Sequence, residues 1–161
     1  MRALYFTFIT ILISSCSIFL GNTKSLKSEK YSSHFNQSNW KEVDPDLSDL
    51  AYTNTKTGSI ILFNSLCKKY DNSSLTNLQK NLLSGLDNIR IINREDVSLY
   101  NRKAIKLTAN ARLDGVLVYL DVYTVKKNRC VYDFVLISSS QNKIAIDRND
   151  FQVFLKKMRI D

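Results

Sequence analysis

The stretch that decides the fold is residues 105–125, which read IKLTANARLDGVLVYLDVYTV. Over residues 105–113 apolar and polar side chains alternate, which is the period of a strand with one buried face. Asp114-Gly115 is a dipeptide favoured in two-residue hairpin turns. With this turn Leu113 pairs with Val116. The same register places Ala111, Ala109 and Leu107 opposite Val118, Leu120 and Val122, so these residues share one face.

Further strands flank this hairpin on both sides. Residues 89–97 predict a strand before it, and residues 126–129 predict the turn that follows it. Residues 130–137 read CVYDFVLI and predict a central strand covered on both faces, because apolar side chains occupy nearly every position. Residues 60–63 form a second such apolar run, and residues 52–54 predict a short strand before it.

Two helices are expected beside these strands. The first runs from Leu75 to Ser84, with Ser73-Ser74 as its cap and Gly85 as its stop. The second begins at an Asp147 cap and carries its apolar face on Phe151, Phe154, Leu155 and Met158. The predicted fold class is therefore α+β: an antiparallel β-meander flanked by two helices, in one domain over residues 40–161.

The N-terminus has the pattern of an export signal. Arg2 precedes an uncharged apolar run, and Ile13-Ser14-Ser15-Cys16 fits a bacterial lipobox. We therefore expect residues 1–15 to be a lipoprotein signal peptide and Cys16 to carry the lipid, palmitate included. Residues 16–39 then form a flexible tether, since they are rich in Ser, Lys and Asn. Ser17 after the Cys favours sorting to the outer membrane.

Two alternatives remain open for this segment. Ile18-Phe19-Leu20 extend the apolar stretch to residues 3–21, which is long enough for an uncleaved membrane anchor. Cleavage by an ordinary signal peptidase after Ser17 would instead secrete the chain. In each case the protein works in the cell envelope or beyond it: at the outer membrane facing the periplasm, on an inner-membrane anchor, or at the cell surface.

The cysteine count fits export. If Cys16 carries lipid, Cys67 and Cys130 remain, and an even pair in an exported chain predicts a disulfide. The bond would close a loop of about 64 residues and stabilise the domain by roughly 4 kcal/mol. Two buried free thiols are the alternative.

The chain is basic, with a formal net charge of +8 that becomes +7 when Arg2 is removed (8 − 1 = 7). This charge suits anionic lipid headgroups or lipopolysaccharide phosphates, and export excludes nucleic acid as a partner. The alternative is an ordinary solvated basic surface. Basic pairs occur at Lys68-Lys69, Arg102-Lys103, Lys126-Lys127 and Lys156-Lys157, and the tyrosines among the strands are Tyr100, Tyr119, Tyr123 and Tyr132.

The sequence contains few of the residue patterns that are typical of catalytic sites. The single histidine, His34, lies in the expected tether, so triads and zinc sites that need a domain histidine are excluded. Asp121 and Asp133 could form a carboxylate pair, but a four-residue turn at 126–129 puts them on opposite faces of the sheet. We expect no enzyme activity, no cofactor and no metal.

The order of elements resembles the PsbP-like family, named after an extrinsic subunit of the photosynthetic oxygen-evolving complex. The residues that support this resemblance are Trp40, the segment 57–61 (TGSII), Tyr132-Asp133-Phe134 and the closing segment 150–155 (DFQVFL). The chain is also similar to small envelope lipoproteins of Gram-negative bacteria. The resemblance implies an α/β/α sandwich and an accessory subunit that binds an envelope protein partner. The alternative function is a lipid- or glycan-binding module with a basic, aromatic-rich surface.

Overall fold

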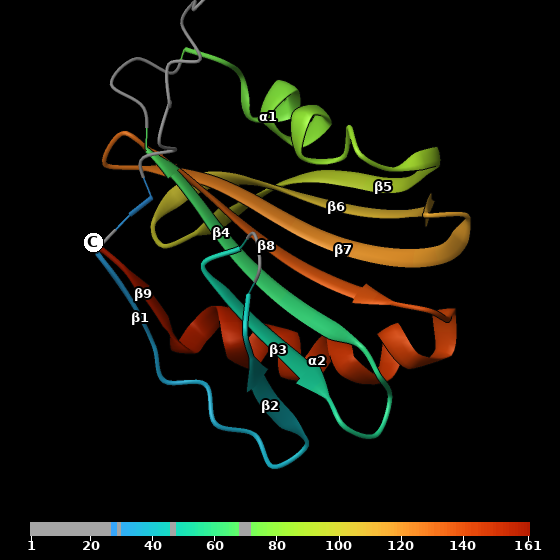
Figure 1. Ribbon diagram of the computed structural model, residues 1–161. Coiled ribbons are helices and arrows are strands. Elements are labelled where there is room, and N and C mark those ends of the chain that lie inside the picture. Colours follow the sequence, from blue (N-terminus) through green and yellow to red (C-terminus); the bar gives the residue numbers. More distant parts are fainter. Residues whose placement is uncertain (1–26, 29, 46–47, 68–71) are drawn as a thin grey trace, which may run out of the picture.

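The computed structural model describes residues 27–161 apart from 29, 46–47 and 68–71. Within them the chain forms a seven-stranded sheet in the order β2-β3-β4-β8-β7-β6-β5, a two-stranded ribbon β1-β9 and two helices (Figure 1). Every strand pair is antiparallel. The strands are β1 (Tyr31–Ser33), β2 (Trp40–Val43), β3 (Leu50–Asn54), β4 (Ile60–Cys67), β5 (Asp87–Leu99), β6 (Arg102–Leu113), β7 (Val116–Lys127), β8 (Cys130–Ser138) and β9 (Met158–Ile160), and the helices are α1 (Leu75–Leu82) and α2 (Gln141–Lys157).

The two helices cover opposite faces of the sheet. Figure 1 shows α1 above the sheet and α2 below it. Helix α1 packs on β6 and β7, whereas α2 packs on β8 and β7. The predicted α+β class, with an antiparallel meander between two helices, is confirmed.

The central hairpin has the predicted register. Leu113 pairs with Val116 across Asp114-Gly115, and the pairs Ala111–Val118, Ala109–Leu120 and Leu107–Val122 follow along β6 and β7. Asp114 and Gly115 both have positive φ, at 50° and 80°. A type I′ turn requires positive φ at both central positions, so this dipeptide fixes the register that buries the hairpin's apolar face.

Each face of the sheet has its own core. Beneath α2, aromatic rings dominate, and Tyr132, Phe63, Phe134, Phe151 and Phe154 are all fully buried. Beneath α1 the core is aliphatic, with Leu83 packed on Leu107, Leu120 and Val122. The strand expected at residues 130–137 is therefore covered on both faces, because its side chains alternate between these two cores.

Helix α1 agrees with the sequence prediction apart from its end. Ser74 caps it by accepting a hydrogen bond from the Asn77 amide, at 3.2 Å. The helix ends at Leu82 with Leu83 as its C-cap, earlier than the predicted Ser84. Leu83 remains buried, so the apolar face of the helix reaches the sheet as expected.

Helix α2 begins earlier than the sequence predicted, and Asp147 is not its cap. Ser140 is the N-cap and accepts a hydrogen bond from the Lys143 amide. Asp147 lies within the helix and is fully buried. Its carboxylate accepts hydrogen bonds from Asn54 Nδ2 at 2.9 Å and from Thr57 Oγ1 at 2.6 Å. The acid therefore joins α2 to the β3–β4 turn.

The segment before Trp40 is part of the domain, contrary to the predicted boundary of the tether at residue 39. Strand β1 pairs with β9, and the Phe35 ring is buried among the rings of the α2-side core. Ser28 is also buried, and its amide donates to Ser65 Oγ at 2.8 Å. These residues are polar enough to read as linker, but their apolar members fill the edge of the core. Ser28 and residues 31–35 therefore belong to the folded domain.

Cys67 and Cys130 are joined by a disulfide in the structure. They lie directly opposite each other on β4 and β8, with 4.0 Å between their Cα atoms. We call the end of the sheet that carries this disulfide the entry end. Lys27 lies near it, with Nζ 3.1 Å from Asp49 Oδ1, and so does the C-terminus, where the Asp161 amide donates to Lys30 O.

Candidate functional site

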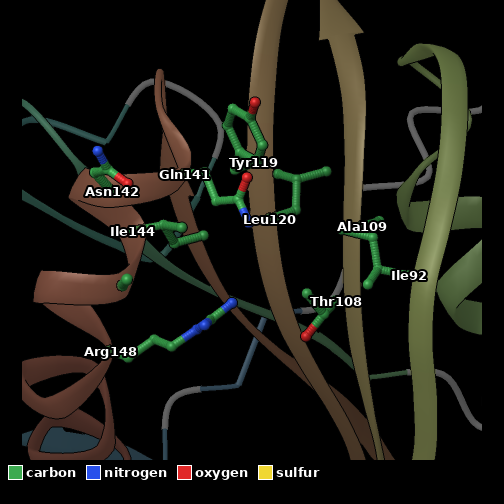
Figure 2. A pocket seen from close by; sticks show the side chains of 10 residues that line it. Ile92, Thr108, Ala109, Tyr119, Leu120, Gln141, Asn142, Ile144 and Arg148 are labelled. Carbon is green, nitrogen blue, oxygen red and sulfur yellow. The ribbon is translucent and has the colours of Figure 1, made fainter.

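A groove of about 320 Å³ lies between the first half of α2 and the adjacent strands β5, β6 and β7. Figure 2 shows α2 as one wall and the strands as the floor and the other wall. We call it the α2 groove. Its lining residues are Ile92, Thr108, Ala109, Tyr119, Leu120, Gln141, Asn142, Ile144, Ala145 and Arg148.

The groove exists because α2 packs on β8 and β7 and leaves the faces of β6 and β5 beside it uncovered. A bulge in β5 completes the far wall. Ile91 pairs with Ala109 and Asn93 pairs with Thr108, so Ile92 is an extra residue at this point. In Figure 2 the Ile92 side chain lies across the groove from α2.

An ion pair between a buried carboxylate and a half-exposed guanidinium lies at one end of the groove. Asp121 is 3% exposed and accepts a hydrogen bond from Thr108 Oγ1 at 2.8 Å. Arg148 extends from α2 toward the strands (Figure 2). Its Nε donates to Asp121 Oδ2 at 2.7 Å. This hydrogen bond raises the pKa of Arg148, so the cation persists at every physiological pH. The ion pair holds α2 against β7, and the Arg148 guanidinium is the charged group that lines this end of the groove.

An apolar patch wraps around the end of the sheet opposite the entry end and reaches both of its faces. Ile91, Leu113 and Val116 lie on the α1 face, whereas Ile92 and Leu117 lie on the face of the groove. Six of the nine large apolar side chains exposed in the described part of the chain gather there. They come from the start of β5 and from the β6–β7 hairpin, which pair through Asp87–Arg112 and Leu113–Val116. We call this patch the apolar corner; it comprises Ile89, Ile91, Ile92, Leu113, Val116 and Leu117. Exposed apolar clusters of this kind commonly mark interaction surfaces.

Asp121 and Asp133 do not meet. Asp133 pairs with Thr124 on β7, three residues from Asp121, so the two carboxylates lie on opposite faces of the sheet, as the four-residue turn predicted. Asp133 accepts a hydrogen bond from Thr124 Oγ1 at 2.6 Å. Burial raises the pKa of Asp133 to about 6, although the Thr124 hydrogen bond lowers it. The geometry gives no shared acid–base site for these two residues.

Most of the tyrosines expected on an aromatic surface are not on the surface. Tyr132 is fully buried, and Tyr123 is buried and accepts a hydrogen bond from Gln152 Nε2 at 2.9 Å. Tyr100 packs against the α2-side core and donates to Leu155 O at 2.7 Å. Only Tyr119 of this set lines the groove. The basic, aromatic-rich surface predicted as the alternative therefore lacks these three rings, because they fill the core.

The remaining predicted positions lie elsewhere. Cys16 and the signal segment fall outside the described residues, and His34 is exposed beside β1. Among the residues that the structure describes, no cluster of three His, Cys, Asp or Glu side chains could hold a metal ion. In the same part of the chain, no helix is long and apolar enough to cross a membrane.

Sequence reasoning missed the groove residues Ile92, Gln141 and Arg148. Starting α2 at Asp147 left residues 141–146 without a helix, so no wall was expected there. The missed signal was Ser139-Ser140, a good N-cap pair after an apolar strand. The β5 bulge gave no sequence signal.

The sequence matches no protein-family model. It also matches no curated protein.

Solved structures with the same fold are found at low sequence identity. LpqN of Mycobacterium tuberculosis, described as involved in cell envelope biogenesis, is 12% identical with a TM-score of 0.58, covering 87% of each chain. The cyanobacterial PsbP of Synechocystis sp. PCC 6803 (CyanoP) is 9% identical with a TM-score of 0.53, covering 88% of this chain and 99% of its own. The Ran-binding protein Mog1p of Saccharomyces cerevisiae is 10% identical with a TM-score of 0.54, covering 84% of this chain and 96% of its own.

These similarities cover 84–88% of this chain. At 9–12% identity they establish a shared backbone arrangement. The chain therefore has the PsbP-like α/β/α sandwich fold.

Proposed function

We propose that the protein is a non-catalytic envelope lipoprotein, tethered to a membrane through Cys16, whose domain binds a protein partner. The α2 groove and the apolar corner form the binding surface. The anchoring membrane is the outer membrane, and the domain faces the periplasm. The partner is another envelope protein, and this chain acts as its accessory subunit.

The clustering of exposed apolar side chains at one end of the sheet carries this proposal. Isolated exposed apolar residues are ordinary, but six within one hairpin and its neighbouring strand are not. Beside them the α2 groove offers a recess with amide, hydroxyl and guanidinium groups from Gln141, Thr108 and Arg148. An apolar centre with polar groups around it is the usual composition of a protein–protein contact.

The buried acids support a binding role over catalysis, since each has a structural partner. Asp121 holds Arg148, and Asp147 holds Asn54 and Thr57. Asp133 sits on the α1 face, away from the groove. The similar structures point the same way by analogy, as Mog1p is described as Ran-binding and LpqN as involved in envelope biogenesis.

Photocrosslinking in intact cells tests the binding surface. A photoreactive residue at Leu117, an exposed member of the apolar corner on the same face as Ile92, is expected to give one discrete adduct with an envelope protein. Adding Ile92→Asp should reduce that adduct about tenfold, because a charge in an interface centre commonly costs 1–3 kcal/mol or more. Ile92 is 58% exposed, so the substitution leaves the fold intact.

Val43→Asp is the matched control, since Val43 is an exposed apolar residue on β2, the opposite edge of the sheet. It should leave the adduct unchanged. Equal losses in the two variants, or no adduct at Leu117, would contradict the proposed binding surface.

Fractionation tests the anchor. Cys16→Ser is expected to move the protein from the membrane fraction to the soluble fraction, because the serine hydroxyl cannot take the thioether-linked lipid. Metabolic labelling with palmitate should mark the wild-type chain and not the variant. Unchanged membrane association of the variant would refute the lipid anchor and favour the apolar stretch over residues 3–21.

A further inference from the structure

The entry end of the sheet gathers most of the exposed basic side chains of the described domain. Three of the basic pairs noted in the sequence meet there, although they lie far apart along the chain. Ten basic residues belong to this end: Lys27, Lys30, Arg102, Lys103, Lys126, Lys127, Arg129, Lys156, Lys157 and Arg159. We call this set the basic end.

Strand register brings these segments together. Arg102 pairs with Leu99 next to the β5–β6 turn, and Lys127 pairs with Cys130 across the β7–β8 turn. Both turns point the same way as the Cys67–Cys130 disulfide, because antiparallel strands alternate their ends. Helix α2 ends here as well, and Lys127 Nζ donates to Ile160 O on β9.

Acidic side chains near the basic end are fewer. Asp49 is paired with Lys27 at 3.1 Å, and Asp96 is paired with Lys103 at 2.8 Å. The acidic side chains in this part of the described domain are Glu42, Asp44, Asp49, Asp96 and Asp161. Ten basic residues against five acidic ones leave an excess of positive charge on one end of the molecule.

We propose that the basic end lies on the anionic phospholipid headgroups of the membrane to which the chain is attached. The proposal rests on the membrane attachment proposed above. Lys27 is only eleven positions after Cys16 along the chain (27 − 16 = 11). Fully extended, they span at most about 40 Å, so an anchor at Cys16 keeps this end of the domain close to the bilayer. Basic residues held near an anionic surface add to the attraction of a single anchor.

Contact at the basic end would orient the domain. Helix α2 starts beside the groove at Gln141 and ends at the basic end with Lys157. Its seventeen residues span about 25 Å. Figure 1 shows the C-terminus at one end of the sheet and the start of α2 at the other. With the basic end on the headgroups, the α2 groove and the apolar corner face away from the membrane.

Lysine footprinting on vesicles tests this orientation. The full chain is reconstituted into phosphatidylcholine vesicles with or without about 30% phosphatidylglycerol, and acetylation of each lysine is followed by mass spectrometry. Lys156 and Lys157 should react about threefold more slowly on the anionic vesicles. Lys56 and Lys143, outside the basic end, are internal controls and should react equally on both. About 0.5 M NaCl should abolish the protection, because it shortens the screening length to a few ångström.

Two charge-reversal variants distinguish an effect of the basic end from an effect of the net charge of the protein. Lys156→Glu, Lys157→Glu and Arg159→Glu together should remove the protection of Lys30 and Lys103 on anionic vesicles. Lys56→Glu, Lys143→Glu and Arg90→Glu make the same change of charge elsewhere and should leave that protection intact. All six side chains are exposed, so both variants should fold.

Equal acetylation of Lys156 and Lys157 on the two kinds of vesicle would overturn the proposal, as would equal protection of Lys56 and Lys143. The acetylation result does not depend on partner binding, which the photocrosslinking experiment measures separately. Acetylation is measured only in chains that sediment with vesicles. The result therefore tests the basic end whether the chain is held by a lipid at Cys16 or by an apolar anchor.

Discussion

Replacing Cys67 and Cys130 with alanine is expected to lower the free energy of unfolding by about 4 kcal/mol. The disulfide encloses α1, β5, β6 and β7, with a sequence separation of 63 residues. In the chain-entropy model, loss of a cross-link of this span costs about 4 kcal/mol, because the unfolded chain regains its freedom. Denaturant unfolding of the oxidised wild type and of the double variant measures the difference.

Reduction of the wild type is the control for the lost side chains. A reductant should lower wild-type stability nearly to that of the double variant, and should leave the variant unchanged. Peptide mapping of envelope-purified protein checks the bond itself, because trypsin cleavage after Lys56, Lys68, Arg129 and Lys143 releases residues 57–68 and 130–143 as one disulfide-linked pair. Recovery of both peptides with freely alkylated thiols would refute the disulfide.

Asp133→Asn is expected to stabilise the domain at neutral pH by about 3 kcal/mol. Burial raises the pKa of this carboxyl from 3.8 to about 6 in the folded state. Between these values the folded state holds a proton that the unfolded state has released, so stability falls as pH rises through this window. Two pKa units correspond to about 3 kcal/mol. Asparagine cannot ionise, and its amide oxygen can still accept the hydrogen bond from Thr124.

The measurement is the difference between the stability profiles of wild type and Asp133→Asn from pH 4 to pH 7. The difference should be small at pH 4 and should grow until about pH 6.5. Asp87→Asn, at an exposed position on β5, makes the same change of charge and is the matched control. Parallel profiles for wild type and Asp133→Asn would show that this carboxyl does not titrate as its burial implies.

The sheet was predictable from sequence because local rules specify it. Strict alternation over residues 105–113 and the Asp114-Gly115 turn left one register that puts Leu107, Ala109 and Ala111 on the same buried face as their partners on β7, and that register is observed. The same reasoning put Asp121 and Asp133 on opposite faces. The connection is two residues, Asn128 and Arg129, rather than the expected four, but either even length gives the same parity of pairing. Both results depend only on neighbours along one hairpin.

The groove was not predictable because it depends on contacts between distant segments. Asp147 has the composition of a helix cap, yet it bonds with Asn54 and Thr57 from a turn ninety residues away. That bond competes with the capping role and places the acid inside α2. Ile92 enters the groove through a bulge, and the register of β5 is decided by its pairing with β6 rather than by its own pattern. Phe35 likewise reads as linker until Trp40, Tyr52 and Phe154 surround it.

The β1–β9 ribbon has a mechanical consequence. If a membrane anchor holds the N-terminal side of Lys27 while a partner pulls on the far end of the sheet, tension acts first on the contacts of Lys27 and Ser28 with Asp49 and Ser65, and then on β1. This strand holds β9 through three residue pairs, Tyr31–Ile160, Ser32–Arg159 and Ser33–Met158. It is outside the seven-stranded sheet, so its detachment leaves that sheet fully paired. We expect the β1–β9 ribbon to separate before the seven-stranded sheet does. Its separation lengthens the segment between the anchor and the sheet by a few residues, so the ribbon is an extensible connection between the anchor and the binding domain.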